Sequence, residues 1–225
     1  MSLPKVETVR RRIESVGRED YRIFLKCAYL FAARVSELVA YASPRDTTIP
    51  RGPTGRDYYI DNFTLGPLKA EAAIFKIKTA KRGGKERLIA LPLDKRFEPW
   101  TESILRYYQK CGDKPLFPFS RQRALQIARQ VFKGLKYPVE RYVIVNQSLG
   151  LRKVVEPHLK PFGLHALRHL RATELIEFYG FDGIDLSIFG GWTLRSMIGV
   201  GGSLERYAHL QWQKYFPKLL KERSF

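Results

Sequence analysis

The sequence contains very few cysteines, methionines and asparagines. The two cysteines, Cys27 and Cys111, are far apart and form no C-x-x-C pair, so neither a disulfide framework nor a cysteine metal site is indicated. Asparagine and methionine each occur twice, and a scarcity of thermolabile residues is typical of proteins from thermophiles. The N-terminal residues show no secretory signal pattern, so we expect a protein of a reducing, intracellular compartment.

Long hydrophobic runs and negative charge are also in short supply. The most apolar stretch, residues 23–42, is interrupted by Lys26, Arg34 and Glu37, so a membrane-spanning helix is not expected. Only 22 Asp and Glu stand against 40 Lys and Arg, which gives a formal net charge of +18. A surplus of this size repels itself and favours a polyanionic partner. Nucleic acid is the first candidate, ahead of a ribosome-associated role or a membrane surface.

The hydrophobic pattern predicts a mainly helical α+β protein. Helices are predicted over residues 6–15, 20–41, 98–110, 120–135, 163–179, 184–189 and 204–222, and strands over 58–60, 72–79 and 85–91. Gly83 and Gly84 are expected to join the last two strands, since glycine tolerates the positive φ angles of tight hairpin turns. Residues 136–161 contain three prolines and are interpreted as irregular with one hairpin. No linker is evident, so we predict one domain over residues 1–225 in which a small antiparallel sheet packs on a helical body.

The most specific pattern in the sequence is the run from His165 to His169. His165 and Arg168 are three residues apart and would share one helix face, so an imidazole and a guanidinium could reach one phosphate. In isolation, such a pair is more often a helix cap next to a surface ion pair. His165 and His169 also have the spacing of a zinc pair, but Ala166 stands where the metalloprotease motif has its glutamate. A metal site is therefore not expected.

Other candidate residues are weaker when each is taken alone. Arg34 lies in an otherwise apolar stretch, where a buried guanidinium needs an anionic partner, and Glu37 could simply be that partner. Tyr207 is one of twelve tyrosines, and packing is the default role of such a residue. Four cations at the predicted hairpin tip form either a solvated face or an element that enters a DNA groove: Lys78, Lys81, Arg82 and Lys85.

Taken together, these stretches resemble the motifs of tyrosine recombinases of the phage-integrase family. Residues 31–38 resemble the family's T-G-L-R-x-S-E-L helix, residues 163–173 its H-x-L-R-H-x-x-A-T box, and residues 206–210 its R-Y-x-H-L segment. Residues 78–93 resemble its lysine-bearing β-hairpin, and residues 189–193 its L-G-G-W or L-G-H segment. The resemblance covers nearly the whole chain in the right order, with an archaeal or archaeal-viral member as the expected type.

The resemblance implies a catalytic domain that cleaves and rejoins double-stranded DNA through a 3′-phosphotyrosyl intermediate, with no cofactor or metal. It implies Tyr207 as the nucleophile, Arg34 and Arg168 as the clamp on the scissile phosphate, and His165 as a proton-transfer residue. The further implied roles are Lys81 as the acid for the departing 5′ oxygen, with Lys78 and Lys85 as alternatives; Trp192 as a hydrogen-bond donor; Glu37 as an orienting residue; and Lys78, Arg82, Lys85 and Arg171 as DNA contacts.

Two departures from the family pattern affect these expectations. The stretch between Trp192 and Tyr207 is longer than in most relatives, which leaves open whether the nucleophile acts in cis or in trans. Arg34 comes so near the N-terminus that the family's N-terminal core-binding domain is expected to be absent. Several protomers, four in the synapse, are expected to assemble on DNA in the cytoplasm or nucleoid of the host cell. A type IB topoisomerase and a non-catalytic DNA-binding module of the same fold are the alternatives.

Overall fold

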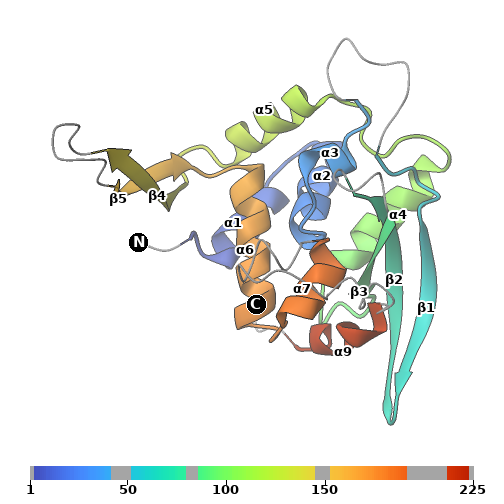
Figure 1. The fold of residues 1–225 in the computed structure, drawn as a ribbon. Helices are drawn as coiled ribbons and strands as arrows, with labels where there is room; N and C mark the ends of the chain where they lie inside the picture. Colours follow the sequence, from blue (N-terminus) through green and yellow to red (C-terminus); the bar gives the residue numbers. More distant parts are fainter. Residues whose placement is uncertain (1–2, 42–51, 80–85, 145–152, 192–211, 223–225) are drawn as a thin grey trace.

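The computed structural model describes residues 3–41, 52–79, 86–144, 153–191 and 212–222 of the 225-residue chain (Figure 1). Its α-helices are α1 (Val6–Glu14), α2 (Glu19–Leu30), α3 (Val35–Leu38), α4 (Thr101–Cys111), α5 (Arg121–Val131), α6 (Leu164–Glu177), α7 (Gly183–Gly190) and α9 (Phe216–Leu219). Its strands are β1 (Tyr58–Leu65), β2 (Leu68–Lys78), β3 (Glu86–Pro92), β4 (Lys136–Ile144) and β5 (Lys153–Pro161). The predicted α+β class is confirmed. Among the described helices, none combines the length and the apolar character needed to cross a membrane.

The predicted helix over residues 20–41 is wrong in its second half. α2 ends at Leu30, and Ala32 adopts a φ of 44°, a left-handed value that is uncommon for any residue other than glycine. Arg34 is extended, and α3 starts only at Val35. This break leaves the carbonyl oxygens of Phe31 and Ala32 without helical partners, and arginine side chains from distant elements bind both. The interruption therefore depends on tertiary contacts that the local pattern does not contain.

The three-stranded sheet has the order β1-β2-β3 and is antiparallel throughout. Four consecutive residues of the central strand, 72–75, are fully buried, because both faces of β2 are covered. On one face Phe75 contacts Phe31 of the α2 turn and Tyr108 of α4. On the other face Phe63 packs against Phe216 of α9. The strands extend the predicted 58–60 and 72–79 segments, and the predicted turn at residues 83–84 lies outside the described residues.

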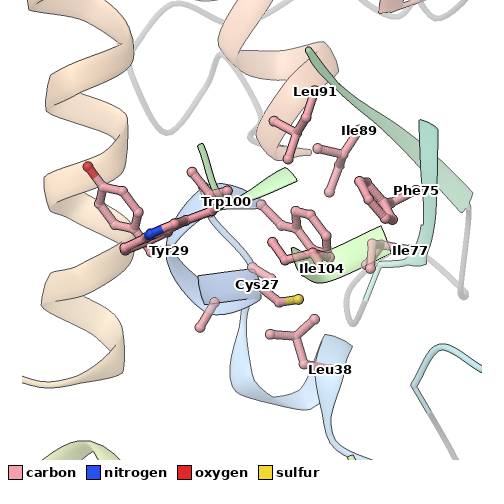
Figure 2. Close-up of a cluster of buried hydrophobic side chains, with 14 of the residues drawn as sticks. Cys27, Tyr29, Leu38, Phe75, Ile77, Ile89, Leu91, Trp100 and Ile104 are labelled. Carbon is pink, nitrogen blue, oxygen red and sulfur yellow. The ribbon is translucent and has the colours of Figure 1, made fainter. Parts of the chain in front are cut away.

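The hydrophobic core lies between this sheet and the helices α2, α3 and α4 (Figure 2). Ile89 and Leu91 of β3 lie beside Phe75 and Ile77 of β2 in this cluster, and all four are fully buried. Cys27 is also fully buried there, and burial raises the pKa of its thiol well above the usual value. This cysteine is therefore an unreactive packing residue. The core packs β3 against α2, and these two elements both border the candidate site described below.

Residues 136–161, interpreted as irregular with one hairpin, contain a regular antiparallel pair of strands. The register of β4 and β5 runs from Lys136 opposite Pro161 to Ile144 opposite Lys153. Proline cannot donate a ladder hydrogen bond, but a two-stranded ribbon consists of edge strands alone, and edge strands tolerate it. The hairpin is confirmed, and the expected irregularity is not found in either strand.

The C-terminal segment is less helical than predicted. Residues 204–211 lie outside the described part, and Trp212–Lys214 forms a 3₁₀ turn before the short helix α9. Pro217 lies in the first turn of α9, where its missing N–H group has no helical partner to lose, so it does not interrupt the helix. Lys214 pairs with the fully buried Asp185 of α7 at 2.8 Å. The segment is thereby held on α7 and on the sheet.

A buried ion pair fastens α1 to the rest of the body. Both side chains are almost inaccessible: Arg10 is 6% exposed and donates to Glu98 at 3.2 and 2.5 Å, and its guanidinium lies 3.9 Å from the ring centre of Trp100. The replacement Glu98→Gln removes the carboxylate charge with which this buried guanidinium pairs. We expect it to lower the free energy of unfolding by about 3–5 kcal/mol, measured by urea denaturation. Asp113→Asn, in an exposed pair, is the control and should change stability little; equal effects of the two would contradict the prediction.

Candidate active site

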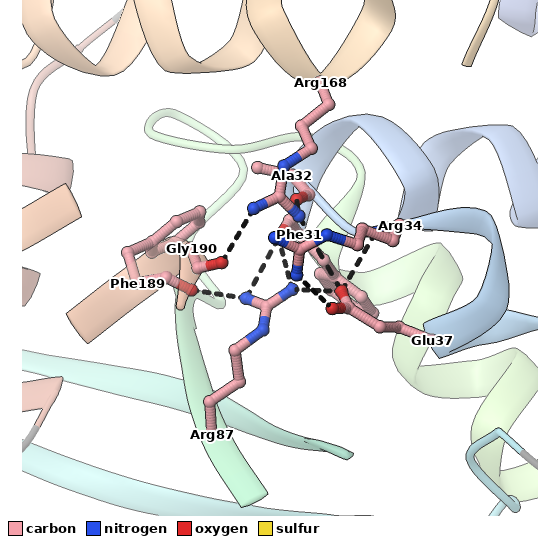
Figure 3. A network of polar contacts seen from close by, with 8 residues as sticks. All are labelled: Phe31, Ala32, Arg34, Glu37, Arg87, Arg168, Phe189 and Gly190. Atoms are coloured by element: carbon pink, nitrogen blue, oxygen red, sulfur yellow. Dashed lines mark hydrogen bonds and ion pairs between the residues drawn. The ribbon is translucent and has the colours of Figure 1, made fainter. Parts of the chain in front are cut away.

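Three arginines from distant parts of the sequence meet at one carboxylate, that of Glu37 (Figure 3). Arg34 immediately precedes α3, Arg87 lies on β3, and Arg168 lies on α6. Oε1 of Glu37 is 2.8 Å from Nη1 of Arg34, and its Oε2 is 3.2 Å from Nη2 of Arg87 and 3.8 Å from Nη1 of Arg168. Only 1% of Glu37 is exposed. We call these four residues the arginine cluster.

Glu37 also fixes the start of α3. Its Oε2 accepts a hydrogen bond from the backbone N–H of Arg34 at 2.9 Å, as the third helical residue does in a capping box. The same carboxylate thus sets the backbone at Arg34 and binds its side chain. This double role explains why Arg34 points into the cluster although the chain around it has left the helix.

Arg168 joins the broken end of α2 to the end of α7. Its Nη1 donates to the carbonyl oxygen of Ala32 at 2.5 Å, and its Nη2 donates to that of Gly190 at 3.0 Å. Carbonyl groups at helix C-termini carry partial negative charge and attract cations. Arg168 is therefore held by carbonyl groups at the ends of two helices, and it also lies close to Arg34, Arg87 and Glu37.

Arg87 makes similar contacts with carbonyl groups at the ends of the same two helices, α2 and α7. It donates to the carbonyl oxygen of Phe31 at 3.1 and 3.2 Å and to that of Phe189. A Cβ added to Gly191 would lie 3.3 Å from Cδ of Arg87 and 3.4 Å from Cγ2 of Thr79. The described end of β2 and the residue after α7 therefore both lie beside the cluster.

The cluster carries more positive than negative charge in a largely buried place. Burial and the neighbouring Arg34 and Arg87 lower the pKa of Arg168 to about 9, although Glu37 acts in the opposite direction. Burial alone would raise the pKa of Glu37, but the three arginines lower it overall. The side chain of Arg34 is 29% exposed, against 7% and 5% for Arg168 and Arg87. An anion approaching from solvent would therefore meet the cluster at Arg34 and offset its excess charge.

His165 and His169 lie on the same stretch of α6 as Arg168, and both are exposed. Their Nε2 atoms are 2.9 Å apart, so one ring can donate to the other. Burial, His165 and Arg168 together lower the pKa of His169. The first helical residues of α6 follow Gly163 without a side-chain cap. The interpretation of His165 as a helix cap and of Arg168 as a surface ion pair is therefore wrong.

Arg171, which the resemblance implies as a DNA contact, is buried in this structure and not exposed on its surface. Only 1% of it is exposed, and its Nη1 donates to Glu174, whose Oε2 also accepts from the hydroxyl of Tyr29 at 2.6 Å. The carboxylate of Glu174 and the surrounding aromatic rings stabilise the buried guanidinium. Arg171 thus belongs to the packing between α2 and α6.

The other expected site residues are distributed as follows. Lys78 is the exposed last residue of β2, at the described end of the hairpin. Lys81, Arg82, Lys85, Trp192 and Tyr207 lie outside the described residues. In the described parts of the chain, no group of three or more His, Cys, Asp or Glu side chains could hold a metal ion.

Arg87 is the cluster residue that sequence reasoning missed. It follows the basic run that includes the hairpin lysines, and the sequence pattern assigned no separate role to it. One signal could have found it: Arg87 alternates with Ile89 and Leu91, and residues at this spacing point to the same face of a strand. An arginine in phase with buried aliphatic residues is expected to be buried as well.

Glu37→Gln tests the central role of the carboxylate. We expect the free energy of unfolding at pH 7 to fall by about 3–5 kcal/mol, because the buried arginines lose their counter-ion. The pKa of Glu37 is lowered in the folded state, so its stabilising effect is complete above its usual value and is lost as pH falls through the folded value. Urea titrations from neutral to acidic pH should therefore show a shallower acid-dependent loss in the variant. Glu102→Gln is the control, since that carboxylate also has a lowered pKa but is exposed to solvent; an unchanged acid response in Glu37→Gln would refute the assignment.

Comparisons with known proteins do not identify a relative with this site. No model of a protein family matches the chain, and no curated protein matches it. The functional assignment accordingly rests on the residues and on their geometry.

Proposed function

We propose that the chain is the catalytic domain of a tyrosine recombinase that cleaves and rejoins double-stranded DNA through a covalent bond to Tyr207. One observation carries the proposal: Arg34 and Arg168, which stand in the two arginine motifs of the resemblance, converge on the buried carboxylate of Glu37. Nothing in the local sequence requires these two residues to meet. Their meeting is what a clamp on one phosphate needs.

The chemistry of phosphodiester cleavage explains why such a clamp is useful. Attack on the phosphorus atom produces a crowded, more negative phosphorane, and pre-positioned cations stabilise it without reorganising. Arginine suits this task because its planar guanidinium presents several donors at fixed angles. Arg168 is buried and crowded, with a pKa of about 9, yet it remains protonated at neutral pH. A phosphate would therefore find a cation whose charge is poorly compensated beforehand.

The proposed reaction balances without an added cofactor. The phenol of Tyr207 gives up its proton to His165, its oxygen forms a bond to phosphorus, and the bond from phosphorus to the 5′ oxygen breaks. Lys81 gives the leaving oxygen its proton, with Lys78 and Lys85 as the alternative donors, while His165 assists proton transfer and contacts the phosphate. Trp192 is the expected additional donor. A 5′ hydroxyl then attacks the phosphotyrosyl bond in the reverse step, and strand exchange follows when that hydroxyl comes from a second duplex.

Tyr207→Phe tests the nucleophile. Nicked duplexes of varied sequence allow the 5′ fragment to diffuse away, so a covalent protein–DNA product accumulates and is seen on a denaturing gel. We expect wild-type protein to form this product in the presence of EDTA and Tyr207→Phe to form none while still binding DNA. Tyr58→Phe, at a half-buried tyrosine of β1, is the matched control. A product that persists in Tyr207→Phe would exclude this nucleophile, and loss of DNA binding in that variant would favour a non-catalytic DNA-binding module.

Arg34→Gln and Arg87→Gln separate phosphate binding from folding. Arg34 is the most exposed arginine of the cluster, so its replacement should slow formation of the covalent product about 10²–10³-fold and cost little stability. Arg87 binds Glu37 and two buried carbonyl groups, so its replacement should lower the free energy of unfolding by about 3–5 kcal/mol. Single-turnover cleavage and urea denaturation measure the two effects. Wild-type cleavage by Arg34→Gln would contradict the proposed clamp.

A further inference from the structure

The β4–β5 strand pair, which we call the arm, projects from the helical body between the end of α5 and the start of α6 (Figure 1). Each strand has nine residues, paired along their whole length. At about 3.4 Å per residue the arm is roughly 27 Å long. Beyond its base, the two strands pack on each other far more than on any other described element. A two-stranded ribbon of this kind is only marginally stable alone in water, so a partner that covers it would stabilise it.

The base of the arm is fixed with respect to the candidate site. The backbone N–H of Phe162 donates to the carbonyl oxygen of Leu135 at 2.9 Å, which closes the ribbon. The ring of Phe162 packs edge-on against Phe132 and Tyr137, with ring centres 5.2 and 6.3 Å apart. Only two residues separate β5 from α6, the helix that carries Arg168. The direction of the arm is therefore tied to the helix of the arginine cluster.

Cations without carboxylate partners gather along α5 and the base of the arm. Residues 114–139 contain no Asp or Glu. Seven exposed cations there and on the facing strand form no ion pair with any described carboxylate: Lys114, Arg121, Arg123, Arg129, Lys133, Lys136 and Lys160. Surface cations on the side of α4 are different, because Arg56, Lys95 and Lys110 each pair with an acidic residue. The positive charge beside the arm is thus not offset by ion pairs with the described carboxylates.

We infer that the arm, together with the exposed face of α5, binds duplex DNA that flanks the cleaved phosphate. This inference rests on the proposed function and assigns a part of the chain to which the resemblance gives no role. A two-stranded ribbon fits the major groove, and cations along its base are placed to contact the phosphate backbone. At roughly 3.4 Å per base pair, an arm of this length covers about eight base pairs. A second copy of the chain is the poorer occupant, because it would bring further positive charge to an uncompensated positive surface.

A matched pair of triple variants tests the inference. Lys133, Lys136 and Lys160 are changed to Gln in one protein, and Arg56, Lys95 and Lys110 are changed to Gln in the other, so both lose the same net charge. Binding to duplex DNA of arbitrary sequence is measured by fluorescence anisotropy over a range of salt concentrations. We expect the first variant to bind at least about tenfold more weakly and to lose about two to three units from the slope of log K against log salt. Equal effects of the two variants would overturn the inference.

Shortening the arm gives a second and independent test. Residues 140–157 are replaced by Asn-Gly, a dipeptide that closes two-residue hairpins. The dipeptide then connects Val139 to its cross-strand partner His158. The change removes five of the nine cross-strand pairs, so we expect weaker binding and a protected region on DNA that is shorter by about five base pairs, with unfolding of the rest of the chain unchanged. Unchanged DNA affinity with an altered molecular mass in light scattering would overturn the inference in favour of a second copy. Neither DNA-binding test requires cleavage, so a failure of the Tyr207 chemistry would be distinguishable from a failure of the arm.

Discussion

The buried carboxylate of Glu37 is the interaction on which the described site depends. It starts α3, holds Arg34 and Arg87, and lies near Arg168. Without its charge, three guanidinium groups would share one small volume without the carboxylate that all of them approach. The break after α2, the position of β3 and the contact between α6 and α7 all use the same set of bonds. Site and fold are therefore stabilised by one network.

Stability alone does not explain such a network. Buried ion clusters recover their desolvation cost only when every charge is well paired, and apolar residues of similar volume often fold at least as well. Here three cations share one anion, and the lowered pKa of Arg168 records the imbalance. Arg171, a short distance along α6, shows the balanced alternative, since Glu174 matches it within the same helix. The contrast between the two arginines favours a cluster that is completed by an external anion, as the proposed phosphate clamp requires.

Sequence reasoning succeeded where structure is determined locally. The helix predicted from residue 120 is found as α5, with the side chain of Ser120 as its N-cap, because capping and apolar periodicity are properties of neighbouring residues. It failed at Ala32, where the sequence remains apolar and helical in pattern but carbonyl groups are taken by arginines from β3 and α6. It placed Arg171 on the surface and overlooked Arg87, because the burial of a cation depends on a partner that the local pattern does not reveal. The residue pattern singled out Arg34 and Arg168 separately, and the resemblance joined them, but the fold was needed to show that both approach Glu37.

Charge distribution links the cluster to the arm. A net charge of +18 says that a polyanion is favoured, but it does not say where it binds. Much of the positive charge near α4 and α9 is neutralised by acidic neighbours such as Glu102 and Asp185. Among the described residues, positive charge without a carboxylate partner includes the surface along α5 and the base of the arm, and inside the arginine cluster three cations share one carboxylate. Because α6 begins two residues after the arm and carries Arg168, a duplex held along the arm would be presented to the cluster by one rigid helix. Under the proposed function, the arm would then position the substrate for the cluster.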